Sequence, residues 1–189
     1  MLGGYMGEIR GRANVFVLVE TKLDGHIDNV IQSIRHNRWK GKIQKEAQGS
    51  TGGILILWDK RIWNGEMVMD GNQCITGKFT SLNDNWSWHL TGVYADCNRV
   101  TRRTLWQELI NVRSTCLGPW IVCGDFNVTR YPSEITSCRR LSGGMAEFSN
   151  CIEELELVDP PLFGGSFTWR RGEDFDCASR IARFLHCAE

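Results

Sequence analysis

Short apolar runs that end in polar residues limit the folds that this chain can adopt. Val15–Val19 and Ile54–Trp58 are uninterrupted apolar runs, and Trp120–Cys123 is a third that follows Pro119. Such runs are typical of strands that are buried on both faces of a sheet. Each is far shorter than the roughly 20 apolar residues that a membrane-spanning helix needs. The runs therefore predict buried strands and no membrane span.

Amphipathic stripes predict helices between these strands. After Asp24, apolar residues recur at the i, i+3, i+4, i+7 spacing of a helix, with Asp24 as the N-cap. Thr104 and Gln107 fit a capping box, which predicts a helix over about 103–116. A third stripe predicts a helix from Met145 to Leu157. Alternation of buried strands and helices indicates an α/β fold.

The middle and the end of the chain predict further strands. Segments at Glu66–Met69, Cys74–Ser81 and Trp86–Ala95 are separated by turn sequences, which favours a meander of antiparallel strands. Ser166–Trp169 and Ile181–Leu185 predict two last strands. The length of 189 residues fits one domain, and we find no repeat or linker in residues 1–189.

Composition argues against two kinds of protein. The 22 Lys and Arg residues cancel the 22 Asp and Glu residues, so we do not expect a domain that holds nucleic acid by bulk positive charge alone. The 8 cysteines include no C-x-x-C pair, which disfavours the usual zinc sites. We expect free thiols that behave as small apolar side chains in a reducing, intracellular compartment. The first residues do not have the pattern of a secretory signal.

Polar residues at the ends of the predicted strands are the candidates for chemistry. Glu20 follows the first apolar run, and Asp125 and Asn127 follow the third. Carboxylate and amide oxygens that meet at one sheet edge would suit Mg²⁺ or Mn²⁺ and would not suit zinc. Each residue also has a structural interpretation, because Glu20 can cap the following helix and Gly124-Asp125-Phe126-Asn127 can form a tight turn.

Seven motifs along residues 14–185 add a pattern to these single residues. They are Val19-Glu20-Thr21-Lys22, Gly52-Gly53-Ile54-Leu55-Ile56, Thr91-Gly92-Val93-Tyr94-Ala95, Val122-Cys123-Gly124-Asp125-Phe126-Asn127, Leu157-Val158-Asp159, Ser166-Phe167-Thr168-Trp169 and Ser179-Arg180-Ile181-Ala182-Arg183-Phe184-Leu185. In this order they resemble the endonuclease/exonuclease/phosphatase family, which has the DNase I-like fold. Among the members of this family, the endonucleases of plant LINE-type retrotransposons are the most similar to this chain in the sequence of residues 161–169.

The resemblance implies a fold, a metal and a set of residue roles. The fold would be a four-layered α/β/β/α sandwich of two mixed sheets with helices outside. Glu20 would bind one or two Mg²⁺ or Mn²⁺ ions, and Tyr94 would contact the scissile phosphate, although a packed strand aromatic would give the same sequence at Tyr94. Asp125 would orient or deprotonate the attacking water, and Asn127 would hold that water or the phosphate. DNA would be the substrate and the nucleus the site of action.

The chain also departs from the family pattern. The family has an Asp in the motif Arg-(Ile/Leu)-Asp-(Arg/Tyr)-Phe, and Ala182 stands at that position here. A terminal Ser-Asp-His motif has no counterpart before Glu189, and Met1–Arg12 contains no good copy of the family's first strand. We therefore expect residues 1–189 to be a partial domain that lacks terminal strands and is catalytically impaired, unless Asp174 or Asp176 replaces the lost carboxylate.

Two alternatives to an active nuclease remain open at this stage. One is a non-catalytic nucleic-acid-binding module, and the other is a remnant without a selected role. The binding module would use a basic and aromatic surface, for which the sequence offers Trp39, Lys40, Lys42, Arg102, Arg103, Arg139, Arg140, Arg170 and Arg171.

Overall fold

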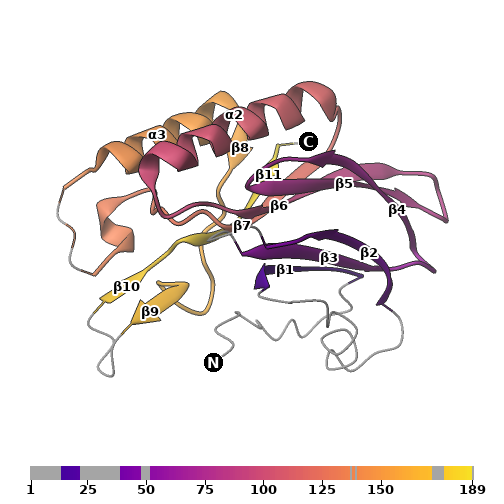
Figure 1. The fold of residues 1–189 in the computed structure, drawn as a ribbon, viewed down its shortest axis with the longest axis horizontal. Coiled ribbons are helices and arrows are strands. Elements are labelled where there is room, and N and C mark those ends of the chain that lie inside the picture. Colours follow the sequence, from indigo (N-terminus) through magenta and orange to yellow (C-terminus); the bar gives the residue numbers. More distant parts are fainter. Residues whose placement is uncertain are drawn as a thin grey trace.

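The structure is a computed structural model that describes residues 14–21, 39–47, 52–136, 138, 140–171 and 177–188. Two sheets lie face to face, and helices cover the outer face of the larger sheet (Figure 1). The two sheets and the mixed α/β character confirm the predicted fold class. The helix predicted from Asp24, which would form the fourth layer, lies outside the described residues.

The smaller sheet has the strand order β1-β3-β2 and is antiparallel throughout. Its strands are β1 (Val15–Thr21), β2 (Trp39–Lys45) and β3 (Gly53–Asp59). The continuous apolar run in β3 is buried along the whole strand, as predicted. The prediction for β1 was only partly right, because its residues are half-buried among the described part of the chain and only one face meets the core.

The larger sheet has the strand order β4-β5-β6-β7-β11-β8. Its pairs are antiparallel except β6 and β7, which are parallel. The parallel pair brings the carboxyl ends of two strands to one edge of the sheet. The strands are β4 (Trp63–Asp70), β5 (Cys74–Ser81), β6 (Ser87–Tyr94), β7 (Trp120–Asp125), β8 (Leu157–Val158) and β11 (Ala182–Cys187).

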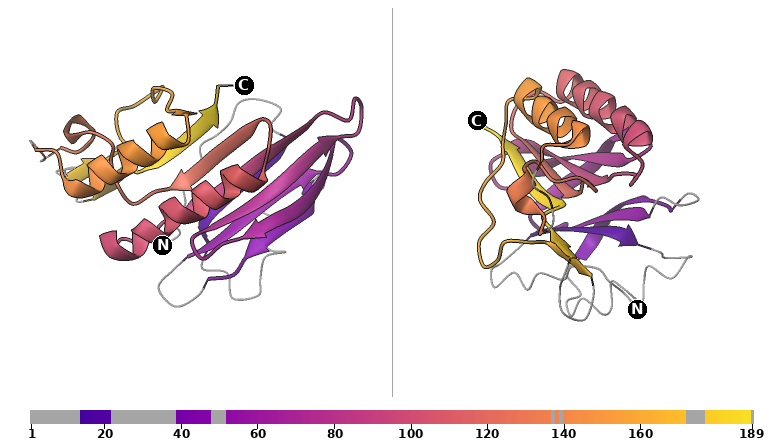
Figure 2. Two further views of the ribbon diagram at one scale, coloured as in Figure 1. Left: turned by 90° about the horizontal axis from the view of Figure 1, so that it is seen from above. Right: turned by 90° about the vertical axis from the view of Figure 1, so that its left-hand side faces the viewer.

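The helices α2 (Arg99–Thr115) and α3 (Gly143–Glu154) lie side by side on the outer face of this sheet (Figure 2). Helix α2 begins before the predicted position, because Asn98 is the N-cap and its Oδ1 accepts the N–H of Val100 at 2.8 Å. The predicted capping box was wrong, since Thr104 lies inside the helix. Helix α3 ends before the predicted Leu157, which instead starts β8.

A short 3₁₀ helix, η1 (Pro132–Glu134), lies between β7 and α3 in the chain. Near the end of the chain, β9 (Trp169–Arg171) and β10 (Cys177–Ser179) form a small hairpin. The strand predicted at Ser166–Trp169 was mostly wrong, because only Trp169 belongs to β9. The hairpin extends beyond the end of both sheets (Figure 1).

Two apolar cores hold the layers together. One lies between the helices and the larger sheet, where the rings of Trp106 and Phe148 stack with their centroids 5.3 Å apart. The other lies between the two sheets and includes Trp58, whose ring meets Phe79 edge-on at 5.4 Å. The cysteines of the chain are free thiols, and Cys74, Cys116, Cys123, Cys151 and Cys187 are buried.

Candidate active site

The predicted site residues Tyr94 and Asp125 lie next to each other at the ends of the two parallel strands. They are the last Cα partners of the β6 and β7 register. Glu20 comes from the opposite sheet, near the end of β1, and its carboxylate acts electrostatically on both Tyr94 and Asp125. The structure thus brings together residues that are up to 105 positions apart, from 20 to 125, at one edge of the sandwich.

Backbone irregularities at the strand ends make this approach possible. Glu20 sits in a β-bulge, where the register with β3 shifts between Val19 and Thr21, and its φ of 59° is left-handed. Bulges re-aim side chains at the rims of sheets. Gly52 lies against this bulge, since an added Cβ would be 2.8 Å from the Cα of Glu20 and 3.1 Å from Cε1 of Tyr94. Only glycine fits between these two candidate residues without a shift.

The residue before Asp125 is also a glycine for a physical reason. Gly124 has a φ of 142°, a backbone conformation that residues other than glycine rarely adopt. An added Cβ would lie 2.0 Å from the carbonyl oxygen of Val93. Gly124 therefore lets β7 pass close to β6 just before the Asp125 side chain.

Asp125 and Asn127 form a tight turn that is also part of the site. The N–H of Asn127 donates to Oδ1 of Asp125 at 2.8 Å, and Nδ2 of Asn127 donates to the carbonyl of Ala95 at 2.7 Å. Asn127 has a left-handed φ of 48°. The structural interpretation as a tight turn over residues 124–127 was only partly right, because Gly124 and Asp125 end β7 and the turn is the one that Oδ1 of Asp125 closes with the Asn127 N–H. These bonds fix both side chains beside the end of β6.

The electrostatics of the site show that its groups act on one another. Burial raises the pKa of Asp125, the Asn127 N–H lowers it, and the Glu20 carboxylate raises it, with a net upward shift. Burial, then Glu20 and Asp125, raise the pKa of Tyr94 to about 12. The Tyr94 hydroxyl is therefore protonated at neutral pH and can donate a hydrogen bond. The site holds two carboxylates whose charges repel.

The oxygen atoms of this site suit a hard divalent cation as ligands. Carboxylate and amide oxygens are the ligands that Mg²⁺ takes, and a cation would relieve the repulsion between Glu20 and Asp125. Within the described ranges no cluster of three or more His, Cys, Asp and Glu side chains is arranged to hold a metal.

Comparison with known proteins gives matches at the level of structure. The sequence matches no family model and no curated protein. The endonuclease domain of TRAS1, a telomere-specific non-LTR retrotransposon, superposes with a TM-score of 0.61 at 18% identity over 79% of this chain. A beta toxin from Staphylococcus aureus superposes with a TM-score of 0.64 at 12% identity, covering 94% of this chain and 73% of the toxin. Sphingomyelinase C from Streptomyces griseocarneus superposes with a TM-score of 0.62 at 15% identity, covering 96% and 73%.

The chain has the DNase I-like fold. It spans 65% of the length of the TRAS1 domain. In the described residues no helix is both long and apolar enough to cross a membrane.

Ala182 lies opposite Asp125 on the neighbouring strand. It is the Cα partner of Asp125 across β11 and β7, so the two side chains lie on the same face of the sheet. A carboxylate at position 182 would therefore stand beside Asp125, and Ala182 offers a methyl group instead. The alternative carboxylates Asp174 and Asp176 lie outside the described residues.

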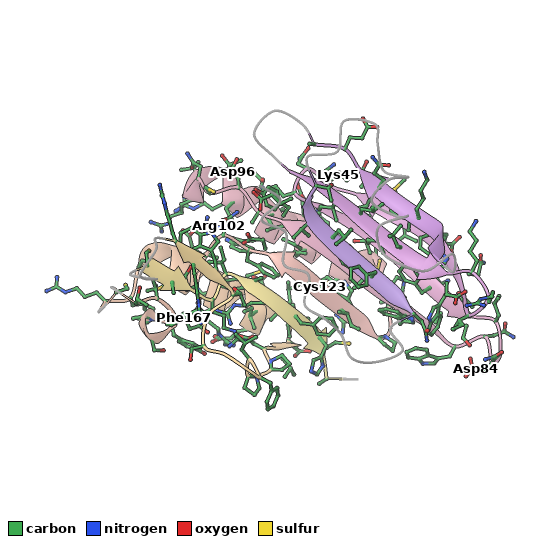
Figure 3. The ribbon with its side chains drawn as sticks, turned by 90° about the horizontal axis from the view of Figure 1, so that it is seen from below. Lys45, Asp84, Asp96, Arg102, Cys123 and Phe167 are labelled. Atoms are coloured by element: carbon green, nitrogen blue, oxygen red, sulfur yellow. The ribbon has the colours of Figure 1, made fainter. Side chains whose placement is uncertain are left out.

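Arg102 corrects one of the predictions for a basic surface. Its side chain is buried, with an exposed fraction of 6%, and it points from α2 toward the strand ends (Figure 3). Arg103 is exposed but pairs with Glu147 of α3 at 2.7 Å. The exposed members of the predicted surface include Lys42, Arg140, Arg170 and Arg171, while the side chains of Trp39 and Lys40 and all of Arg139 lie outside what the structure describes.

A buried ion cluster beside the site was missed by sequence reasoning. Arg183, which is fully buried, donates to Oδ2 of Asp159 at 2.6 Å and also bonds to Glu134. Arg180 joins the cluster through Oδ1 of Asp159 at 2.9 Å. Burial would raise the pKa of Glu134, but Arg183 and the N–H groups of Arg130 and Tyr131 outweigh it and lower the pKa. The signal in the sequence was the pair of arginines around Ala182, whose partners only the fold identifies.

Proposed function

We propose that the chain is a Mg²⁺- or Mn²⁺-dependent phosphodiester hydrolase, a DNA endonuclease domain of LINE-type retrotransposon origin, of the plant type, with impaired turnover. The proposal rests on one observation, that four predicted site residues lie together at one edge of a DNase I-like sandwich: Glu20, Tyr94, Asp125 and Asn127. The likeness to the endonuclease domain of TRAS1 supports DNA as the substrate and a retrotransposon as the origin.

Each residue has a role that follows from its chemistry. Glu20 would hold the divalent ion, which supplies Lewis-acid stabilisation of the charge that develops on the phosphate. Tyr94 would donate its hydroxyl hydrogen to a phosphate oxygen, since its pKa of about 12 keeps it protonated. Asp125 would position the attacking water and accept its proton, a task suited to a carboxylate with a raised pKa. Asn127 keeps its Oδ1 available for this water, because its Nδ2 is bonded to Ala95.

One feature of the site supports impaired turnover. Ala182 removes a carboxylate from the position beside Asp125. Neither described histidine of the larger sheet stands at this end, since His89 pairs with Trp120 and His186 pairs with Ile121 near the opposite strand ends. The proposal of slow nicking rests on the carboxylate that Ala182 does not supply, because a less negative site binds the divalent ion more weakly.

Plasmid nicking tests this proposal. We expect slow conversion of supercoiled plasmid to the nicked form in Mg²⁺, none in EDTA, and a loss of nicking in Asp125→Asn. Asp84→Asn is the matched control, because Asp84 is an exposed carboxylate in the β5–β6 turn that bonds the N–H of Trp86. Nicking that persists in Asp125→Asn, or that is equal in EDTA, would contradict the proposal.

A non-catalytic DNA-binding role is the second candidate, and the hairpin favours it. Trp169 is 38% exposed on β9, and Arg170 and Arg171 beside it are exposed. Aromatic and guanidinium groups together suit stacking on bases and pairing with phosphates. DNA binding that weakens steeply with salt, in a protein that does not nick, would favour this role over an endonuclease.

A further inference from the structure

Arg102 has contacts that a surface arginine would not have. Its Nη1 donates to three backbone carbonyls, those of Asp96 at 2.9 Å, Cys97 at 3.2 Å and Asn127 at 3.1 Å. Gly144 of α3 covers it, since a Cβ there would lie 3.4 Å from Nη2 of Arg102. Burial lowers the pKa of Arg102, which shows that the environment disfavours its charge. Burying a charged group is unfavourable unless it is hydrogen-bonded, so the bonds of Arg102 to the three carbonyls are expected to have a structural role.

The three carbonyls belong to the two loops that leave the site. Asp96 and Cys97 directly follow the strand that ends at Tyr94, and Asn127 follows the strand that ends at Asp125. Arg102 therefore bridges both loops from the first turns of α2. Figure 3 shows Asp96 and Arg102 close to each other at this end of the helix.

The bond to Asn127 holds a backbone conformation that costs free energy. The left-handed region is disfavoured for residues other than glycine and needs support from the surroundings. Asn127 has this conformation, and it orients both the N–H that binds Asp125 and the Nδ2 that binds Ala95. Arg102 is therefore connected to the carboxylate of Asp125 through a single residue, Asn127.

We infer that Arg102 is a positioning residue of the candidate active site, which holds Asn127 and the Asp96–Cys97 turn so that Tyr94, Asp125 and Asn127 converge. The inference concerns the orientation of these groups, and its catalytic consequence rests on the proposed function. Arg102 itself does not reach substrate, because its guanidinium is covered and bonded to the backbone.

Arg113 is a matched control on the same helix. Its Nη1 donates to the carbonyl of Gly118 at 3.2 Å, at the far end of α2 from the site. Lysine at either position keeps a positive charge but replaces the planar, preorganised guanidinium group with an ammonium group on a flexible stem. Arg102→Lys therefore perturbs three backbone hydrogen bonds of Nη1 and Arg113→Lys perturbs one, and only the first set bears on the site.

The experiment measures amide hydrogen exchange and plasmid nicking in the purified wild-type protein and both variants. In Arg102→Lys we expect the amides of Ala95 and Asn127 to exchange at least about tenfold faster, since each lost charged hydrogen bond is worth that much or more. We expect the maximal nicking rate to fall at least about tenfold while half-saturating DNA changes less than about twofold. Arg113→Lys should leave these amides and the nicking rate unchanged.

The two arms separate the two hypotheses. A wild-type protein without nicking would contradict the proposed function, and the exchange arm would still decide the role of Arg102. Unchanged exchange at Ala95 and Asn127 in a folded Arg102→Lys protein, or equal effects of both substitutions, would overturn the inference. If Arg102→Lys does not fold, hydrogen exchange of the wild-type protein tests the inference. The inference requires the Asn127 amide and the amides of the first turns of α2 to become exposed to exchange in the same opening step.

Discussion

At the scale of single residues, the pair of Asp125 and Ala182 decides the charge of the site. The two are partners across neighbouring strands, so a side chain at 182 lies within reach of the same ligand as Asp125. Burial raises the pKa of Tyr94 most, and the charges of Glu20 and Asp125 raise it further. The site therefore has the negative charge of two carboxylates where the family pattern has room for a third.

Restoring the third carboxylate should strengthen metal binding. We expect Ala182→Asp to lower the Tm in EDTA, because a further negative charge joins Glu20 and Asp125, and to give a larger rise in Tm with Mg²⁺ than the wild type shows. Thermal denaturation across a Mg²⁺ titration measures this.

The control for Ala182→Asp places the same charge farther along the strand. Phe184 is 54% exposed on the same face of β11 and is the partner of Cys123. Phe184→Asp should not increase the stabilisation by Mg²⁺. Equal responses to Mg²⁺ in both variants would mean that position 182 does not face the metal site.

At the scale of secondary-structure elements, the two helices are tied together by one carboxylate. Glu147 of α3 accepts from Arg99 and Arg103 of α2, each at 2.7 Å. The hydrogen bonds from Arg99 and Arg103, against a small desolvation cost, lower the pKa of Glu147 to about 2. This clamp lies at the end of α2 that also carries Arg102.

The clamp predicts a defined dependence of stability on pH. Because the folded state lowers the pKa of Glu147 from 4.5 to about 2, its contribution is present above pH 4.5 and is lost as the pH falls toward 2. We expect Glu147→Gln to have a lower Tm than the wild type at neutral pH and low salt, with a difference that disappears in acid. Glu154→Gln, an exposed change on the same helix, should show no such difference. A Tm difference for Glu147→Gln that is independent of pH would refute the clamp.

The contact between the edges of the two sheets depends on two glycines. The Trp58 ring fits between β2 and β4 because a Cβ on Gly41 would lie 2.0 Å from its Cε2 atom and a Cβ on Gly65 would lie 2.6 Å from it. We expect Gly65→Ala to destabilise the protein by about 1–3 kcal/mol, the range for overpacked cores. Gly165→Ala is the control, since no atom lies within 4 Å of a Cβ there. Urea denaturation of both variants measures the difference, and equal midpoints would contradict the packing.

At the scale of the whole molecule, the buried ion cluster connects segments that are far apart in the sequence. Arg183 of β11 joins Glu134 of η1 to Asp159, which follows β8. We expect Arg183→Met to lower the free energy of unfolding by about 3 kcal/mol, the low end for breaking a buried pair, because Arg130 and Arg180 remain near the two carboxylates. Urea denaturation tests this against Arg171→Met, which changes an exposed residue. A loss below about 1 kcal/mol would show that the cluster is not a major tie.

Local sequence patterns were enough to predict most strands of the core, both described helices and the candidates at the strand ends, but not β2, whose residues read as a basic stretch. Runs such as Ile54–Trp58 carry this information locally, because burial on both faces leaves no polar position. Only tertiary packing buries Arg102 and brings Arg183 to Asp159 and Glu134. It also placed Glu20 within the electrostatic reach of Asp125. The physical reason is that propensity and periodicity act between neighbours in the chain, whereas buried charges and active sites take their partners from strands that only the packing of two sheets brings together.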